Sequence, residues 1–316
     1  MKNTIKYMCM IALMALAFTS CKKTETEEKE HHSTFKATIE DFEYEDADGE
    51  KAYIGQNLRV YFEDDDVCMA FNMSEDDPLS SHCATYEVVN NDNGTATFQN
   101  CDLGEVAEDM LDAYYAFYPG NIVTNDGIEH HVITELSEGE NKMKFYVSPS
   151  QTYREDMVSR NALIMAAMVD DVDHLSEAHF SFRNLFGVLR LQPYEAAQRS
   201  VTSIEIVDNT FTLTGWVELI IPEIGVSKGD GFNFIDFDKG GNTVTLNCEV
   251  PVQLGVSKPT TPAFNIVLRP LALSQGFHII FSFDDGSVKD VDLSSYNSLM
   301  IKPNVVWNQG LNLDNY

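Results

Sequence analysis

Residues 277–293 read FHIIFSFDDGSVKDVDL, and this stretch shows in one place the pattern that decides the fold. Apolar and polar residues alternate through Phe277–Phe283 and again through Ser287–Leu293, with Asp285-Gly286 between the two runs. Successive side chains of a strand point to opposite faces, so this alternation indicates two strands that each bury one face. An Asp-Gly pair between such runs is a strong local signal of a β-hairpin.

The same pattern extends over the whole chain from Ser33 onward. Short runs rich in valine, isoleucine, phenylalanine, tyrosine and threonine are separated by turn residues such as Asp48-Gly49, Asn93-Gly94 and Asp126-Gly127. The sequence therefore predicts an all-β protein. The predicted strands are Thr34–Glu40, Asn57–Phe62, Val67–Phe71, Thr85–Val89, Thr95–Phe98, Ala113–Phe117, His130–Thr134, Lys144–Val147, Phe186–Leu191, Val201–Val207, Gly215–Ile221, Thr243–Val250, Phe264–Leu268, Phe277–Phe283, Ser287–Leu293 and Leu299–Lys302.

Two segments have helix-forming composition instead. Gly104–Asp112 is expected to be a short turn of surface helix. Asn161–Val169 is short and apolar on all sides, so its pattern fits a helix and a buried strand equally well.

The length of the β region predicts more than one domain. Roughly 280 residues exceed what one sandwich usually contains, so we expect two stacked domains of about 140 residues each. The boundary is expected near His174–Glu177, after the acidic stretch Asp170–Asp173 and before the apolar run that begins at His179. The predicted domains are residues 34–175 and residues 176–316.

The first twenty residues have the layout of a signal peptide, with Lys2 and Lys6 ahead of an apolar run from Met8 to Phe18. The run is well short of the roughly 18 residues that a helix needs to cross a bilayer, so we expect residues 1–20 to be cleaved. Phe18-Thr19-Ser20-Cys21 resembles the lipobox of bacterial lipoproteins, which implies acyl chains on Cys21. The alternative is ordinary secretion with Cys21 as a free thiol.

Residues 21–33 are expected to form an acidic tether, because residues 22–30, KKTETEEKE, contain nothing apolar to bury. An acidic run behind a lipidated cysteine is similar to the signal that carries some Bacteroidetes lipoproteins to the outer face of the outer membrane. The chain has a net charge of −29, which becomes −31 without Lys2 and Lys6. Such a charge disfavours nucleic acid and anionic lipid head groups, so the lipid is the expected membrane contact.

Four cysteines remain after the leader and the lipidated residue: Cys68, Cys83, Cys101 and Cys248. Four cysteines allow three pairings, and their spacing matches no zinc motif. We expect at most one disulfide among Cys68, Cys83 and Cys101, with Cys248 buried as a small apolar residue.

The sequence shows no catalytic motif, so no enzyme, cofactor or metal site is expected. Adjacent carboxylates arise by chance in so acidic a chain, and we expect them to lie in solvated turns. These pairs and triplets are Asp64-Asp65-Asp66, Asp76-Asp77, Asp170-Asp171 and Asp284-Asp285. The calcium-loop-like Asp46-Ala47-Asp48-Gly49 lacks the required glutamate, since position 55 is Gly55.

A set of short motifs runs along the chain: TFKATIE (34–40), LRVYFEDDD (58–66), YYAFYP (114–119), VSPSQTY (147–153), FSFRNLFGVLRL (180–191), VTSIEI (201–206), TVTLNC (243–248) and LMIKPN (299–304). In this order the motifs resemble those of the fimbrillin-like surface lipoproteins of Bacteroidetes. The resemblance implies two tandem transthyretin-like Greek-key β-sandwich domains. It also implies a structural or adhesive component of fimbriae, as subunit, anchor or tip.

Association in that family proceeds by β-strand complementation, in which a donor strand fills a groove opened by removal of the first strand. The implied partners are other fimbrial subunits or further copies of the chain, together with host or bacterial surface ligands. The removable strand here would be Thr34–Glu40, in which Phe35, Ala37 and Ile39 form the apolar face. The implied maturation cut would follow Arg59, although Arg59 lies within a predicted strand.

Two alternatives stay open at this stage. Leu299–Trp307 fits both a donor strand and the last strand of the second domain. A surface glycan-binding lipoprotein of a polysaccharide-uptake system is the alternative function, in which the aromatic cluster Tyr114, Tyr115, Phe117 and Tyr118 would stack on sugars. Alternation favours core packing for that cluster.

Overall fold

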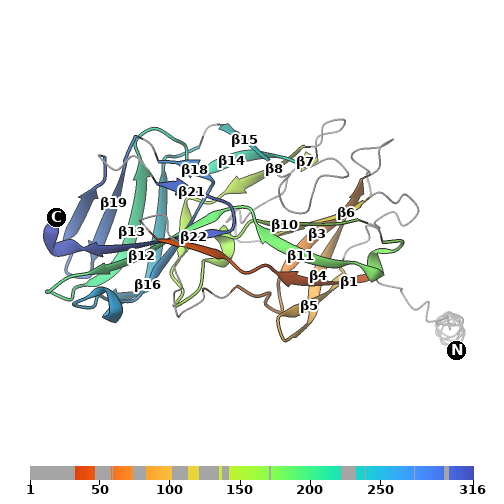
Figure 1. Cartoon of the computed structure of the whole chain (residues 1–316), viewed down its shortest axis with the longest axis horizontal. Coiled ribbons are helices and arrows are strands. Elements are labelled where there is room, and N and C mark those ends of the chain that lie inside the picture. The colour runs from red at the N-terminus through yellow and green to blue at the C-terminus, as the bar shows by residue number, and fades with distance from the viewer. Residues whose placement is uncertain are drawn as a thin grey trace, which may run out of the picture. The chain divides into compact units, whose positions relative to one another are not determined.

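The computed structural model describes residues 33–46, 58, 60–73, 83–101, 113–120, 135–136, 142–170, 172–221, 233–238, 240–273, 275–294 and 299–316. Residues 33–316 form one compact unit built almost entirely of strands (Figure 1). The helical elements described are short 3₁₀ turns: η1 (Arg160–Ala162), η2 (Leu175–Glu177), η3 (Lys258–Thr260) and η4 (Leu313–Asn315). None of the helices in the described ranges is long and apolar enough to span a membrane.

Seven strands close into a barrel in the hydrogen-bonded order β1-β11-β10-β6-β3-β4-β5. They are β1 (Thr34–Ile39), β3 (Val67–Met73), β4 (Cys83–Asp92), β5 (Thr95–Asn100), β6 (Ala113–Tyr118), β10 (Met165–Asp170) and β11 (His179–Asn184). The β4–β5 turn contains Asn93 and Gly94, both with the positive φ that tight hairpin turns require. A first hydrophobic core of aromatic and small apolar side chains includes the residues that point into the barrel.

The central sheet has the order β17-β12-β22-β2, and most of β17, β12 and β22 is buried on both faces. Its strands are β2 (Glu43–Asp46), β12 (Gly187–Tyr194), β17 (Phe264–Leu268) and β22 (Val305–Asn312). Val188, Val267 and Val306 on one face belong to the first core, whereas residues such as Leu189 and Trp307 belong to a second core. Burial on both faces explains why β12 and β17 are almost continuously apolar.

The outer sheet, in the order β20-β19-β13-β16-β9, packs across the second core from the central sheet. Its strands are β9 (Ser150–Thr152), β13 (Ser200–Asp208), β16 (Thr243–Gln253), β19 (Phe277–Phe283) and β20 (Val288–Asp292). Two small sheets complete the described strands: β15-β14-β8-β7 and β18-β21. They contain β7 (Glu135–Leu136), β8 (Lys142–Val147), β14 (Gly215–Ile220), β15 (Asn233–Asp238), β18 (Leu271–Ala272) and β21 (Met300–Ile301).

The prediction of an all-β fold is confirmed, and most predicted strands are present with small differences at their ends. Asn161–Val169 resolves into the turn η1 and the buried strand β10. The predicted strand Asn57–Phe62 is wrong at its described residues, Leu58 and Val60–Phe62, which have no strand pairing. Gly104–Asp112 and His130–Thr134 lie outside the described residues. The division into domains at residues 175 and 176 stays a prediction, and β11 lies after that point but belongs to the barrel.

The cysteines and the aromatic cluster can be compared with their predictions. Cys68 is a buried free thiol on β3, so it forms no disulfide with Cys83 or Cys101. Cys248 is also a free thiol, and it is half-buried against the second core rather than fully buried. The cluster at Tyr114–Tyr118 is buried throughout β6, as expected for core packing.

Candidate functional site

The N-terminal strand β1 lies between β5 and β11 and closes the barrel (Figure 1). It pairs antiparallel with β5 over Thr34–Ala37 and parallel with β11 over Lys36–Ile39. Its ends are also held, because the Lys36 amide donates to the Ala178 carbonyl at 3.2 Å and the Glu40 amide to the Phe182 carbonyl at 2.8 Å. Loss of β1 would therefore leave both β5 and β11 with unpaired backbone groups along a slot in the barrel.

The inner face of β1 consists of the side chains that the sequence singled out. Phe35 and Ala37 are fully buried, and Ile39 is partly buried against the first core. The Phe35 ring lies 4.9 Å from the Tyr86 ring, 5.3 Å from the Phe98 ring and 4.9 Å from the Phe180 ring, measured between centroids. The slot is thus lined by an aromatic cage with room for one large side chain and, two residues on, one small side chain.

The chain leaves β1 and immediately enters the central sheet as β2. Phe42 is buried between the two strands, and Tyr44 packs against the first core. β2 runs parallel to β22, with the Glu43 amide donating to the Asn304 carbonyl at 3.0 Å and Lys302 paired with Glu45 at 2.7 Å. The first two strands therefore belong to different sheets, although only residues 40–42 separate them.

A charged cluster fixes the segment that follows Arg59. Arg59 itself lies outside the described residues. Arg154 pairs with Glu63 at 2.7 Å, and Arg160 pairs with Glu63 at 3.1 Å, with Asp65 at 3.0 Å and with Asp66. The Tyr118 hydroxyl donates to Asp66 at 2.7 Å.

The expectation of a solvated acidic turn is wrong for Asp66, which is only 2% exposed. Burial alone would lower the pKa of Arg160, but hydrogen bonds to Asp66 and Asp65 outweigh it and raise that pKa. Burial and the nearby Asp66 charge raise the pKa of Tyr118. Its position in a run of three aspartates did not indicate these contacts, because the partners of Asp66 are Tyr118 and Arg160, far along the chain.

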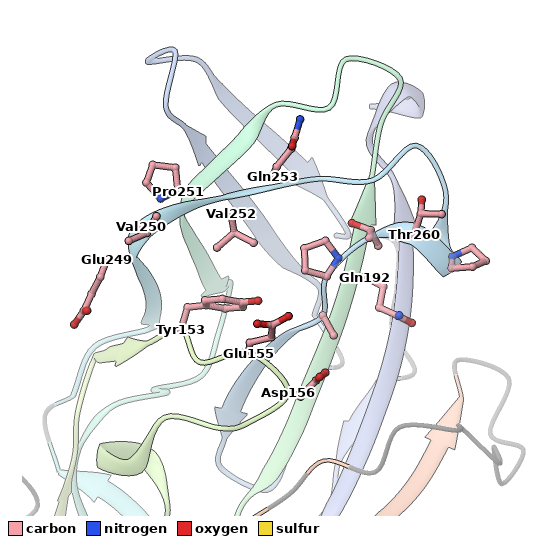
Figure 2. Close-up of a pocket in the computed structure, with 14 residues that line it drawn as sticks. Tyr153, Glu155, Asp156, Gln192, Glu249, Val250, Pro251, Val252, Gln253 and Thr260 are labelled. Carbon is pink, nitrogen blue, oxygen red and sulfur yellow. The ribbon is translucent and has the colours of Figure 1, made fainter.

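An open groove of about 700 Å³ lies beside the outer sheet, where β9 ends (Figure 2). Tyr153, Glu155 and Asp156 come from the loop after β9, and the end of β16 and the segment around η3 supply most of the other walls. Figure 2 shows Tyr153, Glu155 and Asp156 beneath the chain that carries Val250, Val252 and Gln253. The remaining lining residues are Gln192, Glu249, Pro251, Pro259, Thr260, Thr261, Pro262 and Ala263.

The walls of this groove are held by local contacts. The turn η3 begins with a capping box between Ser257 and Thr260, and proline occupies its first turn. Gly255 passes so close to Thr260 that an added Cβ would lie 2.5 Å from its backbone, which requires glycine there. The Gly255 amide donates to the Thr261 hydroxyl at 3.2 Å, and that hydroxyl donates to the Pro193 carbonyl.

The groove is negatively charged. The described residues that line it include three carboxylates, from Glu155, Asp156 and Glu249, and no lysine or arginine. Burial, together with the charges of Glu155 and other neighbours, raises the pKa of Tyr153 to about 12. Sequence reasoning missed this site because its residues come from segments far apart in the sequence and form no binding motif.

Cys21 and the tether up to residue 32 lie outside the described residues, as does Arg59. The structure therefore places Phe35, Ala37 and Ile39 together on one strand and does not describe the other predicted site residues.

Comparison with known proteins gives the fold. No protein-family model and no curated protein matches the sequence. A solved "putative cell adhesion protein" from Bacteroides uniformis matches with a TM-score of 0.50 and 13% identity, covering 89% of this chain and 94% of that one. A second such protein from Bacteroides ovatus has a TM-score of 0.49 and 10% identity over 89% of this chain and 93% of its own.

A fimbrial assembly protein from Parabacteroides distasonis has a TM-score of 0.37 and 8% identity, over 90% of this chain and 93% of its own. At such identities the first match establishes a shared fold only. The chain therefore shares the all-β fold of a Bacteroides uniformis protein described as a "putative cell adhesion protein".

Proposed function

We propose that the chain is a cell-surface component of fimbriae, structural or adhesive, that associates with other subunits by β-strand complementation. The observation that carries this proposal is the position of β1. It is the first strand described, it closes a barrel between two other strands, and it inserts Phe35 and Ala37 into a preformed aromatic cage. A strand of another subunit with the same alternation could replace it with the same backbone hydrogen bonds.

Whether β1 stays in the barrel determines which role in an assembly the protein can have. With β1 in place the barrel is closed, and its first-strand slot offers no space to a donor. We infer that the chain with an intact N-terminus roots or ends an assembly, and that a cut after Arg59 would release β1 and β2 together. The charged cluster formed by Glu63, Asp66, Arg154 and Arg160 would hold the new N-terminal segment in place after that cut.

A reversible lock on β1 tests strand exchange. Lys36 and Thr97 are paired across β1 and β5, and Lys36 is exposed, so Lys36→Cys with Thr97→Cys would tie β1 down by a disulfide without altering the core. In protein cut after Arg59, the oxidised double variant is expected to keep β1 and lose association with fimbrial subunits, and to regain it with reductant. Glu87→Cys with Gln99→Cys is the matched control, because it ties β4 to β5 and leaves β1 free. Equal assembly by locked and unlocked protein would contradict strand exchange.

The membrane anchor is a separate part of the proposal. We infer that Cys21 carries acyl chains and fixes the protein to the outer membrane, with the folded unit outside the cell. Mass spectrometry of the mature N-terminus is expected to find an acylated Cys21, and Cys21→Ser is expected to release the protein into the medium. An unmodified Cys21 on an intact chain would exclude the lipid anchor.

A further inference from the structure

We propose that the groove beside β16 binds an extended, positively charged peptide segment of a partner protein. This site is distinct from the β1 slot and is independent of strand exchange. At the edge of the outer sheet, β9 pairs with β16 over Thr245–Asn247. Beyond Asn247, as far as Gln253, no described strand pairs with β16 on that side.

The end of β16 has a shape suited to an interaction surface. Between Val201↔Val252 and Ser203↔Asn247 the register shifts, so four residues of β16 stand opposite one of β13 and bulge from the sheet. Val250 in this bulge is 74% exposed, the largest exposure among the large apolar residues described. Pro251 has no N–H to donate, so a visiting segment cannot form a regular ladder along this edge. Side chains of the groove must therefore supply most of the recognition.

The charge of the groove selects the occupant. Glu155 and Glu249 form no ion pair within the described part of the chain, and Asp156 has only Arg190, 3.9 Å away. Unpaired carboxylates in a concave site favour cationic groups and repel anionic ones. The half-buried Tyr153 ring, packed 5.1 Å from the Phe264 ring, adds a face on which an ammonium or guanidinium group can lie.

The size and geometry of the groove argue against smaller cations and against self-association. Among the described residues, no group of three His, Cys, Asp or Glu is placed to hold a metal ion. A volume of about 700 Å³ also far exceeds the space that one ion requires. A second copy of this chain, with its net charge of −29, would be repelled. A basic segment from a different protein fits both the volume and the charge.

The rigid walls favour an extended segment. Pro251, Pro259 and Pro262 fix the backbone on both sides of the groove, and the Ser257–Thr260 capping box holds the turn between them. A groove that is already formed loses little conformational entropy when a chain enters it. This preorganisation favours binding without rearrangement of the outer sheet.

Titration of the full chain with synthetic peptides tests the proposal. The probes are the peptides KTKTKTK, ETETETE and STSTSTS, each acetylated and amidated at its ends. Isothermal calorimetry measures the binding of each peptide. Only the lysine peptide is expected to bind, with an affinity that falls as salt is raised. Glu155→Gln with Glu249→Gln is expected to weaken it about tenfold, whereas the control Glu87→Gln with Glu177→Gln leaves it unchanged.

Three results would overturn the proposal. They are failure of the lysine peptide to bind, equal binding by the groove and control variants, and binding of the neutral peptide with the same affinity. Binding of an uncharged oligosaccharide in place of the lysine peptide would assign the groove to glycans instead. If the lysine peptide binds but the β1 disulfide leaves assembly unchanged, the groove proposal is supported and strand exchange is rejected. The two proposals can therefore be judged separately.

Discussion

The first and last strands of the folded unit are both interior strands, but they are integrated to very different extents. β1 has six residues and pairs over four of them with each neighbour. β22 has eight residues and pairs with β12 over seven of them and with β2 over four. Buried apolar side chains on β1 serve the first core alone, whereas β22 gives Val306 to the first core and Trp307 and Leu311 to the second.

This difference indicates which of the two strands can be exchanged. Withdrawing β1 opens one slot in the barrel, and the second core keeps all its residues. Withdrawing β22 would split the central sheet and expose both cores. The last three residues of Leu299–Trp307 begin β22, the strand that joins the two cores, which favours a final strand over a donor segment.

Deletion of residues 305–316 is expected to have the largest effect on folding. Without β22, β2 and β12 lose a common neighbour, so we expect loss of cooperative unfolding and of soluble protein. Circular dichroism during heating measures this. A variant that lacks residues 33–40 is the comparison, and it should keep a folded second core. Similar unfolding of the two deletion variants would contradict the proposed difference between β1 and β22.

Phe35→Ala tests how firmly β1 is held. The substitution removes a fully buried ring from the cage of Tyr86, Phe98 and Phe180, so we expect a loss of about 3–5 kcal/mol in the free energy of unfolding of the barrel. Urea denaturation measures it. Lys36→Ala, on the exposed face of the same strand, is expected to change the value by less than about 0.5 kcal/mol. Equal effects would mean that β1 is not held by its apolar face.

Acid sensitivity tests the end of the β12–β22 pair. Hydrogen bonds from Arg199 lower the pKa of Glu195, which lies just after β12. A lowered pKa means that the folded state binds fewer protons, so this stabilisation is full above about pH 4.5 and is lost as the pH falls. Glu195→Gln should therefore lower Tm at pH 7, and its gap to the natural protein should close as the pH falls through the lowered pKa of Glu195. A gap that stays constant with pH would contradict this role.

Gly94→Ala and Gly286→Ala are expected to have the smallest effects on stability. Both glycines have positive φ in hairpin turns, at +84° and +79°, with open space around an added Cβ. Each substitution is expected to cost about 1 kcal/mol through backbone strain alone. Urea denaturation of both variants should give similar losses, since neither turn touches a core. A much larger loss for Gly94→Ala would show that the β4–β5 hairpin controls the seating of β1.

The sequence predicted the parts of the fold that local pattern determines. The alternation around Asp285-Gly286 and in Thr34–Glu40 gave the hairpin and the first strand, because burial of one face leaves a period of two. The sequence pattern did not predict elements whose strand partners are far along the chain. β2 is short and acidic, and only its partner β22 makes it a strand. Leu58 and Phe62 are buried from a segment without strand partners, so apolar alternation there was misleading.

The candidate sites follow the same rule. Phe35 and Ala37 were found from one strand, because strand periodicity is local. The buried Asp66 and the acidic groove could not be found, since each depends on residues that meet only after folding. Asp66 pairs with Arg160, and Glu155 and Glu249 come from two different segments, the loop after β9 and strand β16.

Native-state hydrogen exchange tests the central claim, that the first strand can detach while the last cannot. The amides of Thr34–Ile39 and of Val305–Asn312 would be followed in the same intact protein. We predict that the β1 amides exchange through a partial opening of lower free energy than the global unfolding that governs the β22 amides. Equal protection of the two strands, or stronger protection of β1, would contradict the account.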